Sequence, residues 1–157
     1  HKIEFLWRIH RVHHSDTQMD VSTAIRFHPI EIALSMALKI GLVYALGADP
    51  LSILFFEILL NGSSMFNHAN IKIPTQIDKV LRLFIVTPDM HRIHHSSDRN
   101  EHDTNFGFAL SVWDRFFRTY KDYPQTKHED MELGLNWQDE KPEKLGWSLA
   151  LPFRKNE

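Results

Sequence analysis

The chain has 157 residues, a formal net charge of −2 and no cysteine. Its length suits one domain with a buried core. The lack of cysteine excludes disulfides, thiolate metal ligands and a cysteine nucleophile. The slightly acidic charge argues against a nucleic-acid partner, because binding to phosphates needs a basic face.

The first element carries a histidine pattern that occurs twice, at residues 10–14 and again at 91–95. In a helix, positions i, i+3 and i+4 share a face, so each copy would present three imidazoles together. Neutral imidazole binds zinc, copper, iron and nickel near pH 7. The two faces predict a metal site lined by His10, His13, His14, His91, His94 and His95.

Two apolar runs, 30–46 and 51–65, come next. Each would form a helix of about 16 residues, or ~24 Å, shorter than the ~30 Å hydrocarbon core of a membrane. Gly47 and Pro50 between them favour a turn. We expect a shallow or tilted membrane hairpin over about 30–66, with a buried hairpin of a soluble protein as the alternative. Lys39 and Glu57 are the charges inside the runs, and we interpret both as structural.

Lysine and arginine flank the apolar runs on both sides, whereas the connecting turn has neither. By the positive-inside tendency both flanks face the cytoplasm, so both histidine copies lie on one side of the membrane, as a shared metal site requires. The flanking residues are Lys2, Arg8, Arg11 and Arg26 before the runs and Lys72, Lys79, Arg82, Arg92 and Arg99 after them.

Residues 77–85 have the apolar spacing of an amphipathic helix. Such a helix suits a membrane surface, where it would shape a lipid entrance, and equally a globular core. Thr87, Pro88 and Asp89 then predict a helix start, because threonine caps, proline suits the first position and aspartate favours the positive end. The apolar stripe consists of Ile77, Val80, Leu81, Phe84 and Ile85.

An aromatic-rich segment follows the second histidine copy, and we expect its side chains to pack mainly in the core. The carboxylates Glu101, Asp103 and Asp114 are candidates to accept hydrogen bonds from metal-bound imidazoles. The aromatic residues are Phe106, Phe108, Trp113, Phe116, Phe117 and Tyr120.

Three further histidines lie outside the repeated pattern. We interpret His28 as structural, and His102 and His128 as solvated. From residue 121 to 157 the chain is polar and interrupted by prolines, which predicts an irregular tail docked through residues 149–153.

The number of histidines points to two metal ions. His1 and His68 bring the set to eight, whereas one zinc ion takes about four ligands. Soluble di-iron bundles use Glu-x-x-His motifs, and the chain contains none. We therefore expect a dinuclear site dominated by histidine.

With these motifs the chain resembles the fatty acid hydroxylase and sterol desaturase superfamily, membrane-bound di-iron oxygenases with spaced histidine boxes. The matching stretches are 1–14, 26–31, 66–71, 87–96, 105–107 and 113–120. Members usually open with His-x-x-x-His, and His1 stands at the second histidine. Since the sequence has no initiator methionine or leader, we expect an N-terminally truncated domain over 1–157.

Two positions depart from the family pattern. Some relatives carry two histidines in the middle box, where this chain has only His68. Arg118 stands where a glycine is common before Thr119 and Tyr120. That glycine is expected for backbone reasons, so the change concerns a tight turn rather than chemistry.

The resemblance implies an all-α fold, a helical membrane hairpin with a cytosolic, histidine-lined cap, and the eight histidines as ligands of two iron ions. It implies oxygen-dependent hydroxylation or desaturation of a fatty acyl or sterol-like lipid. Zinc has no redox chemistry, so iron is required, with dioxygen as co-substrate. Electrons would come from an external redox protein, because the chain has no flavin or nicotinamide fingerprint.

Two other functions fit the same residues. A zinc-dependent hydrolase would use metal-bound water as the nucleophile, although the chain has no His-Glu-x-x-His pattern. A non-catalytic metal-binding membrane module would need no substrate cavity. Metal analysis combined with oxygen consumption separates these alternatives from the oxygenase.

Overall fold

The computed structural model describes residues 1–137 and 142–154, and within them it is helical, with two isolated bridges and no β-strand. The expected all-α class is confirmed. The α-helices are α1 (Glu4–His14), α2 (Pro29–Leu46), α3 (Pro50–His68), α4 (Thr75–Leu81), α5 (Pro88–His94), α6 (Arg99–His102), α7 (Val112–Phe117) and α8 (Leu145–Ala150). The 3-10 helices are η1 (Val21–Ile25), η2 (His128–Asp130) and η3 (Leu151–Phe153).

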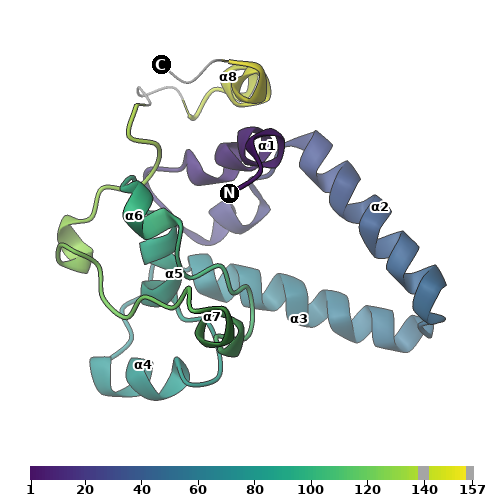
Figure 1. Ribbon diagram of the computed structural model, residues 1–157, viewed down its shortest axis with the longest axis horizontal. Coiled ribbons are helices and arrows are strands. Elements are labelled where there is room, and N and C mark those ends of the chain that lie inside the picture. Colours follow the sequence, from purple (N-terminus) through teal and green to yellow (C-terminus); the bar gives the residue numbers. More distant parts are fainter. Residues whose placement is uncertain (138–141, 155–157) are drawn as a thin grey trace.

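Helices α2 and α3 form a hairpin that projects from the rest of the molecule (Figure 1). Each begins at a proline and is capped by the preceding side chain. The ring of His28 accepts from the N–H of Ile30 at 3.2 Å, and Asp49 accepts from two N–H groups of α3 at 3.0 and 3.1 Å. Gly47 ends α2 at φ 62°, a conformation that glycine adopts without strain. The caps extend the helices beyond the apolar runs, to 18 and 19 residues.

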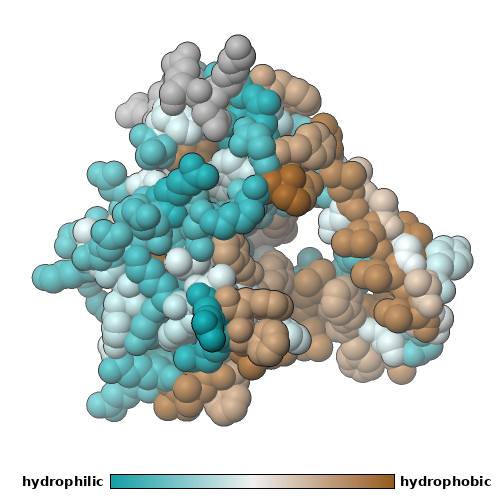
Figure 2. All heavy atoms as spheres, viewed as in Figure 1, coloured by the Kyte–Doolittle hydropathy of each residue, from teal (hydrophilic) through white to brown (hydrophobic). Residues whose placement is uncertain are grey.

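The hairpin exposes its apolar side chains. No residue of α2 is buried, and α3 buries only Ser64, Asn67 and His68 near its end. Figure 2 shows hydrophobic side chains over both helices. Within the described part of the chain, α2 is the one helix long and apolar enough to cross a membrane, judged by length and composition. Lys39 donates to Glu57 at 2.7 Å and ties α2 to α3, a structural role for both charges.

The C-terminal segment docks on α1. Leu135, Trp147 and Leu151 form a buried cluster with Val12. The fully buried Arg11 donates to the carbonyl of Leu151 at 2.5 Å, which fixes η3 against α1. The expected tail thus contains η2, α8 and η3 among its described residues, and its positions 138–141 and 155–157 lie outside them.

The amphipathic segment at 77–85 differs from the expectation in length and orientation. Helix α4 ends at Leu81, and Ile77 and Val80 are more than half exposed. The buried side chains are instead Asp78 and Arg82, which form an ion pair at 2.5 Å. Arg82 also donates to a backbone carbonyl at 2.7 Å, so its charge is satisfied inside. The core-facing interpretation is therefore wrong for Ile77, Val80 and Phe84, which are exposed, whereas Leu81 and Ile85 are half-buried.

The expectation that the aromatic segment packs in the core is wrong for α7. Trp113, Phe116 and Phe117 are all more than half exposed. The inward side of this short helix is occupied by Asp114, which is 2% exposed and binds backbone N–H groups. The aromatic rings therefore point outward.

Arg118 adopts φ 59° at the end of α7, a left-handed conformation that strains an L side chain. We expect Arg118→Gly to raise the free energy of unfolding by about 0.5–1 kcal/mol, because glycine adopts this conformation freely. Urea unfolding in detergent measures the change. Arg115→Gly, inside the same helix, is the control and should lower stability; equal effects of both changes would refute the backbone explanation.

Candidate metal centre

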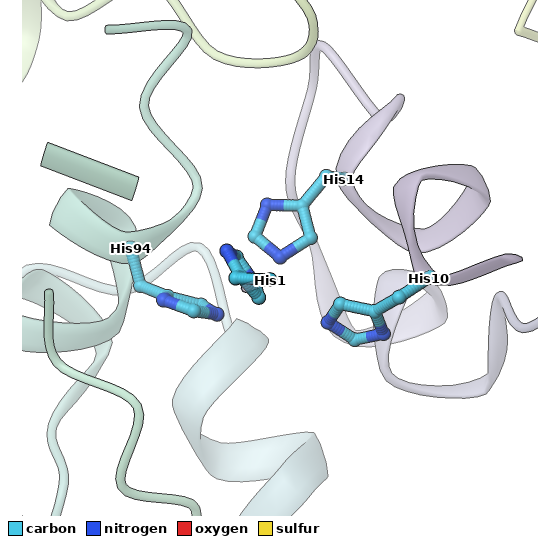
Figure 3. A group of neighbouring side chains, drawn as sticks. All are labelled: His1, His10, His14 and His94. Atoms are coloured by element: carbon cyan, nitrogen blue, oxygen red, sulfur yellow. The ribbon is translucent and has the colours of Figure 1, made fainter. Parts of the chain in front are cut away.

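Eight histidines gather in two groups of four between α1, the end of α3 and α5. Within each group, one ring nitrogen from every residue lies within 4.8 Å of the others. The first group consists of His1, His10, His14 and His94, whose rings surround a common space in Figure 3. The second group consists of His13, His68, His91 and His95. These are the eight residues singled out from the sequence.

Each histidine triplet contributes to both groups. On α1, His10 and His14 lie in the first group and His13 in the second; α5 and its C-cap are divided in the same way. The rings of His14 and His95 stack at a centroid distance of 4.4 Å, so the groups are adjacent. Adjacent groups of four donors each suit a dinuclear centre.

The start of α5 follows the local sequence. The side chain of Thr87 accepts from the N–H of Met90 at 3.4 Å, and Pro88 occupies the first helical position, as predicted. One turn later the helix presents His91 and His94 toward α1 and α3.

Four of the rings donate Nδ1–H to a fixed acceptor, which leaves the lone pair of a neutral ring on Nε2. A histidine oriented in this way is ready to bind a metal ion through Nε2. The pairs are His10 to Glu31 at 2.8 Å, His13 to the carbonyl of Arg26 at 3.3 Å, His68 to the carbonyl of Ser64 at 2.7 Å, and His94 to the carbonyl of Thr104 at 2.8 Å.

Burial keeps the imidazoles in the neutral form that a metal ion requires. It lowers the pKa of His13, His14, His91 and His95 well below the usual value. It lowers the pKa of His94 to about 3, despite the opposing hydrogen bond to Thr104. At pH 7 these rings carry no charge.

The second group has a feature that a bound cation explains. Nε2 of His68 lies 3.0 Å from Nε2 of His13 and 3.1 Å from Nε2 of His91. In neutral rings of His13 and His68 these nitrogens carry lone pairs, which repel each other at this distance. Both ring nitrogens of the buried His95 also lack a partner. A metal ion would satisfy these nitrogens together, so the donor set fits one.

The carboxylates proposed as imidazole partners take different roles. Glu101 accepts from Ser96 at 2.7 Å and from the N–H of Gln125 at 2.6 Å, and within the described residues its side chain forms no hydrogen bond with a histidine. Asp103 lies 3.6 Å from His1 and pairs more closely with a lysine. The carboxylate that does bind a ring of the groups is Glu31, which the sequence analysis missed, because only folding brings it against α1.

Asp114 organises the loop next to the histidines. Its side chain accepts from the N–H of Phe106 at 2.7 Å, the N–H of Gly107 at 2.8 Å and the hydroxyl of Thr119 at 2.6 Å. A Cβ at Gly107 would lie 2.5 Å from this carboxylate, which explains the glycine. The loop holds the ring of Phe106 5.5 Å from that of His94. Asp114 thus acts on the site through Phe106, not through an imidazole.

The three outlying histidines have distinct positions. His28 caps α2, which agrees with its structural interpretation. His102 is not solvated: burial lowers its pKa, its ring stacks on Trp7 at 5.1 Å, and it forms a third possible ligand group with His1 and Asp103. His128 is half-buried rather than solvated, and it lies outside the two groups.

A cavity of about 370 Å³ opens beside the histidines, between the inner ends of α2 and α3. Histidines of both groups line it, together with Phe27, Leu60 and Phe108. A larger cavity of about 610 Å³ lies near Lys72 and His128 and includes no member of the two groups. The smaller cavity is the one placed for chemistry at the histidines.

A family model described as fatty acid hydroxylase matches residues 1–119. The chain belongs to this family. It is 32% identical over 128 residues to the ornithine lipid hydroxylase OlsE of Rhizobium tropici, an alignment covering 82% of this chain and 38% of the relative. It is 28% identical over 138 residues to the alkylglycerol monooxygenase of Homo sapiens, covering 86% and 28%.

A third similar protein is the alkylglycerol monooxygenase of Danio rerio, 30% identical over 124 residues that cover 76% of this chain and 26% of the relative. The chain thus spans between about a quarter and two-fifths of the length of these fatty acid hydroxylase relatives. No solved structure gives a significant match.

The neutral histidines of this fatty acid hydroxylase domain predict a pH effect on the metal-free protein. Their pKa is lowered on folding, so below the unfolded value of about 6.5 the unfolded state binds more protons. Stability should be full above about pH 7 and fall between pH 6.5 and 5, by up to about 1.4 kcal/mol per pH unit for each such ring. Urea unfolding across this range measures the slope.

His94→Gln should reduce this slope by the contribution of about one bound proton, because glutamine does not titrate in this range. His128→Gln, outside the groups, serves as the comparison and should reduce the slope less. An unfolding free energy that stays constant from pH 7 to 5 would contradict burial of neutral rings.

Proposed function

We propose that the protein hydroxylates a lipid with dioxygen, using two iron ions bound by the two histidine groups. The main support is the pair of adjacent histidine groups. In each group four ring nitrogens lie within 4.8 Å of one another, and the chain belongs to the fatty acid hydroxylase family. One ion would be held by His1, His10, His14 and His94, and the other by His13, His68, His91 and His95.

The donor set and the family together favour iron. Imidazole suits zinc, copper, iron and nickel alike, so the ligands alone do not choose. Zinc has no redox chemistry, and inserting oxygen into an unactivated C–H bond requires a redox-active metal. When bound, the two irons would supply the reductive activation of dioxygen.

The overall reaction is R–H + O2 + 2e⁻ + 2H⁺ → R–OH + H2O. One oxygen atom enters the new hydroxyl group and the other leaves as water. Two electrons come from an external redox protein, the partner that the resemblance implies. The names of the similar proteins, a lipid hydroxylase and two monooxygenases, favour hydroxylation over desaturation.

The chain's own residues would prepare the site. Hydrogen bonds from Nδ1 aim the Nε2 lone pairs of four rings at the two groups. The ring of Phe27 stacks on His13 at 4.5 Å, and Phe106 covers His94. These aromatic side chains exclude water and leave an apolar space for the hydrocarbon part of a lipid.

We propose further that the hairpin enters a membrane, with α4 and α7 lying on its surface. Both short helices expose apolar residues, and aromatic side chains such as Trp113 are typical of membrane interfaces. Lys2, Lys72 and Lys79 are exposed on the flanks of the hairpin, which favours the cytoplasmic side for the histidines. Arg11 and Arg82 are buried and contribute little to this argument.

Replacing His94 by alanine tests the ligand assignment. We expect His94→Ala to lose most bound iron and at least about 100-fold in turnover, because it removes a donor of the first group. Metal analysis and mass spectrometry of the hydroxylated lipid, made from ¹⁸O2, provide the readouts. His128→Ala should keep both iron and turnover.

Each alternative function predicts a different result. Zinc with hydrolysis and no oxygen uptake would identify a hydrolase, and metal without any turnover would identify a binding module. Full iron and full turnover in His94→Ala would refute the assignment of this histidine.

The membrane orientation is tested by the fluorescence of Trp113. In vesicles of brominated lipid, we expect this exposed tryptophan to be quenched, because α7 would lie at the acyl boundary. Trp113→Phe should remove most of the quenching of the whole protein, whereas Trp147→Phe, at a buried position, should not. Quenching unaffected by Trp113→Phe would show that α7 faces away from lipid.

A further inference from the structure

Besides ring nitrogens of the histidines, two buried polar atoms on the wall of the 370 Å³ cavity lack a hydrogen-bond partner. They are Oε2 of Glu31 and Oγ of Ser64. Ser64 is only 4% exposed, so its hydroxyl is withdrawn from bulk water. A buried polar atom without a partner is costly, and in a cavity it indicates what the occupant has to supply.

The second carboxylate oxygen of Glu31 can accept hydrogen bonds, and an ionised carboxylate has no hydrogen to donate. Oε1 of Glu31 takes Nδ1–H of His10 at 2.8 Å, which holds the carboxylate in place on α2. The other oxygen is therefore a fixed acceptor at the wall of the cavity. A ligand that binds to this oxygen must therefore present an O–H or N–H group.

Ser64 lines the same cavity from α3, whereas Glu31 lies on α2. The backbone carbonyl of Ser64 accepts from His68 at 2.7 Å, so the hydroxyl lies one turn from a histidine of the second group. Glu31 touches the first group and Ser64 the second. A polar group bound by both would lie at the histidine end of the cavity.

Most of the remaining non-histidine wall is apolar. Phe27, Leu60, Phe106 and Phe108 line the cavity, and the hairpin beyond it is apolar as well. Such a space suits a hydrocarbon chain. Ser35 and Asn61 also line it, so the cavity combines a polar end next to the histidines with a mostly apolar remainder.

We propose that Glu31 and Ser64 select lipids that carry a hydroxyl or amide N–H within a few atoms of the carbon that is oxidised. This inference rests on the proposed function, because it takes the cavity as the substrate site. Glu31 would accept a hydrogen bond from the O–H or N–H of the lipid. The Ser64 hydroxyl would form a second hydrogen bond with the same polar group. An alkyl chain without such a donor would leave the carboxylate oxygen unpaired.

Two probes with the same chain length separate these cases: hexadecane-1,2-diol and 1,2-dimethoxyhexadecane. Only the diol donates hydrogen bonds. Binding to the iron-loaded protein is measured by calorimetry in detergent without oxygen, so that turnover does not interfere. We expect the diol to bind about 10- to 100-fold more tightly, the range for a hydrogen bond to a charged acceptor.

Substitutions test whether Glu31 and Ser64 cause the preference for the diol. Glu31→Gln and Ser64→Ala should each reduce the ratio of the two affinities, to less than about threefold for Glu31→Gln, because an amide no longer offers a charged acceptor. Ser63→Ala, the neighbouring serine on α3, should keep the wild-type ratio. The ratio does not depend on the fraction of folded protein, because unfolded protein lowers the apparent affinity for both probes equally.

The outcomes distinguish this inference from the proposed function. Equal affinity for the two probes, or an unchanged ratio in Glu31→Gln, overturns the inference even if the protein hydroxylates lipids. Failure of the proposed function appears instead as absent oxygen uptake with the donor preference intact. With oxygen and a chemical reductant that supplies the two electrons, we expect the new hydroxyl in the diol near its polar end; oxidation in the methyl half of the chain would overturn the inference.

Discussion

The hydrogen bonds that the buried imidazoles donate from Nδ1 constrain most of the surrounding structure. Their acceptors are the side chain of Glu31 on α2 and the backbone carbonyls of Arg26, Ser64 and Thr104. Arg26 and Glu31 lie at the start of the hairpin, Ser64 lies on α3, and Thr104 lies in the loop after α6. The bonds from His10 and His13 fix the base of the hairpin against α1, the bond from His94 fixes the loop after α6 against α5, and the bond within α3 orients His68. Small displacements of any of these segments would turn a ring away from its group.

Besides an apolar core, the protein buries many polar residues and exposes many large apolar ones. Buried positions hold Arg11, the Asp78 and Arg82 pair, and Asp114, each of which makes hydrogen bonds or an ion pair. The exposed surface of α2, α3, α4 and α7 is apolar (Figure 2). A chain surrounded partly by lipid gains nothing by hiding apolar side chains, while its polar groups need internal partners. The membrane orientation proposed above would account for the exposed apolar side chains of the hairpin and of both short helices.

The same two residues contact the histidine groups and line the cavity. Glu31 orients His10 with one oxygen and faces the cavity with the other, and Ser64 holds His68 through its carbonyl while its hydroxyl faces the cavity. A change of the Glu31 side chain would thus act on both metal binding and lipid binding, whereas Ser64→Ala removes the hydroxyl and keeps the carbonyl that binds His68. The affinity ratio of two matched lipids separates these effects, because a metal defect alters both affinities together.

Local sequence determined the features that depend on helix geometry and capping. The spacing in residues 10–14 and 91–95 places three imidazoles on one helical face, Gly47 and Pro50 specify the turn of the hairpin, and Thr87 begins α5. Tertiary structure decided how the histidines divide into two groups, that Glu31 binds His10, and that α4 and α7 turn their apolar sides outward. These features depend on contacts between distant segments and on what surrounds the chain. Periodicity identifies an apolar face, but only the packed structure shows whether that face meets the core or the outside.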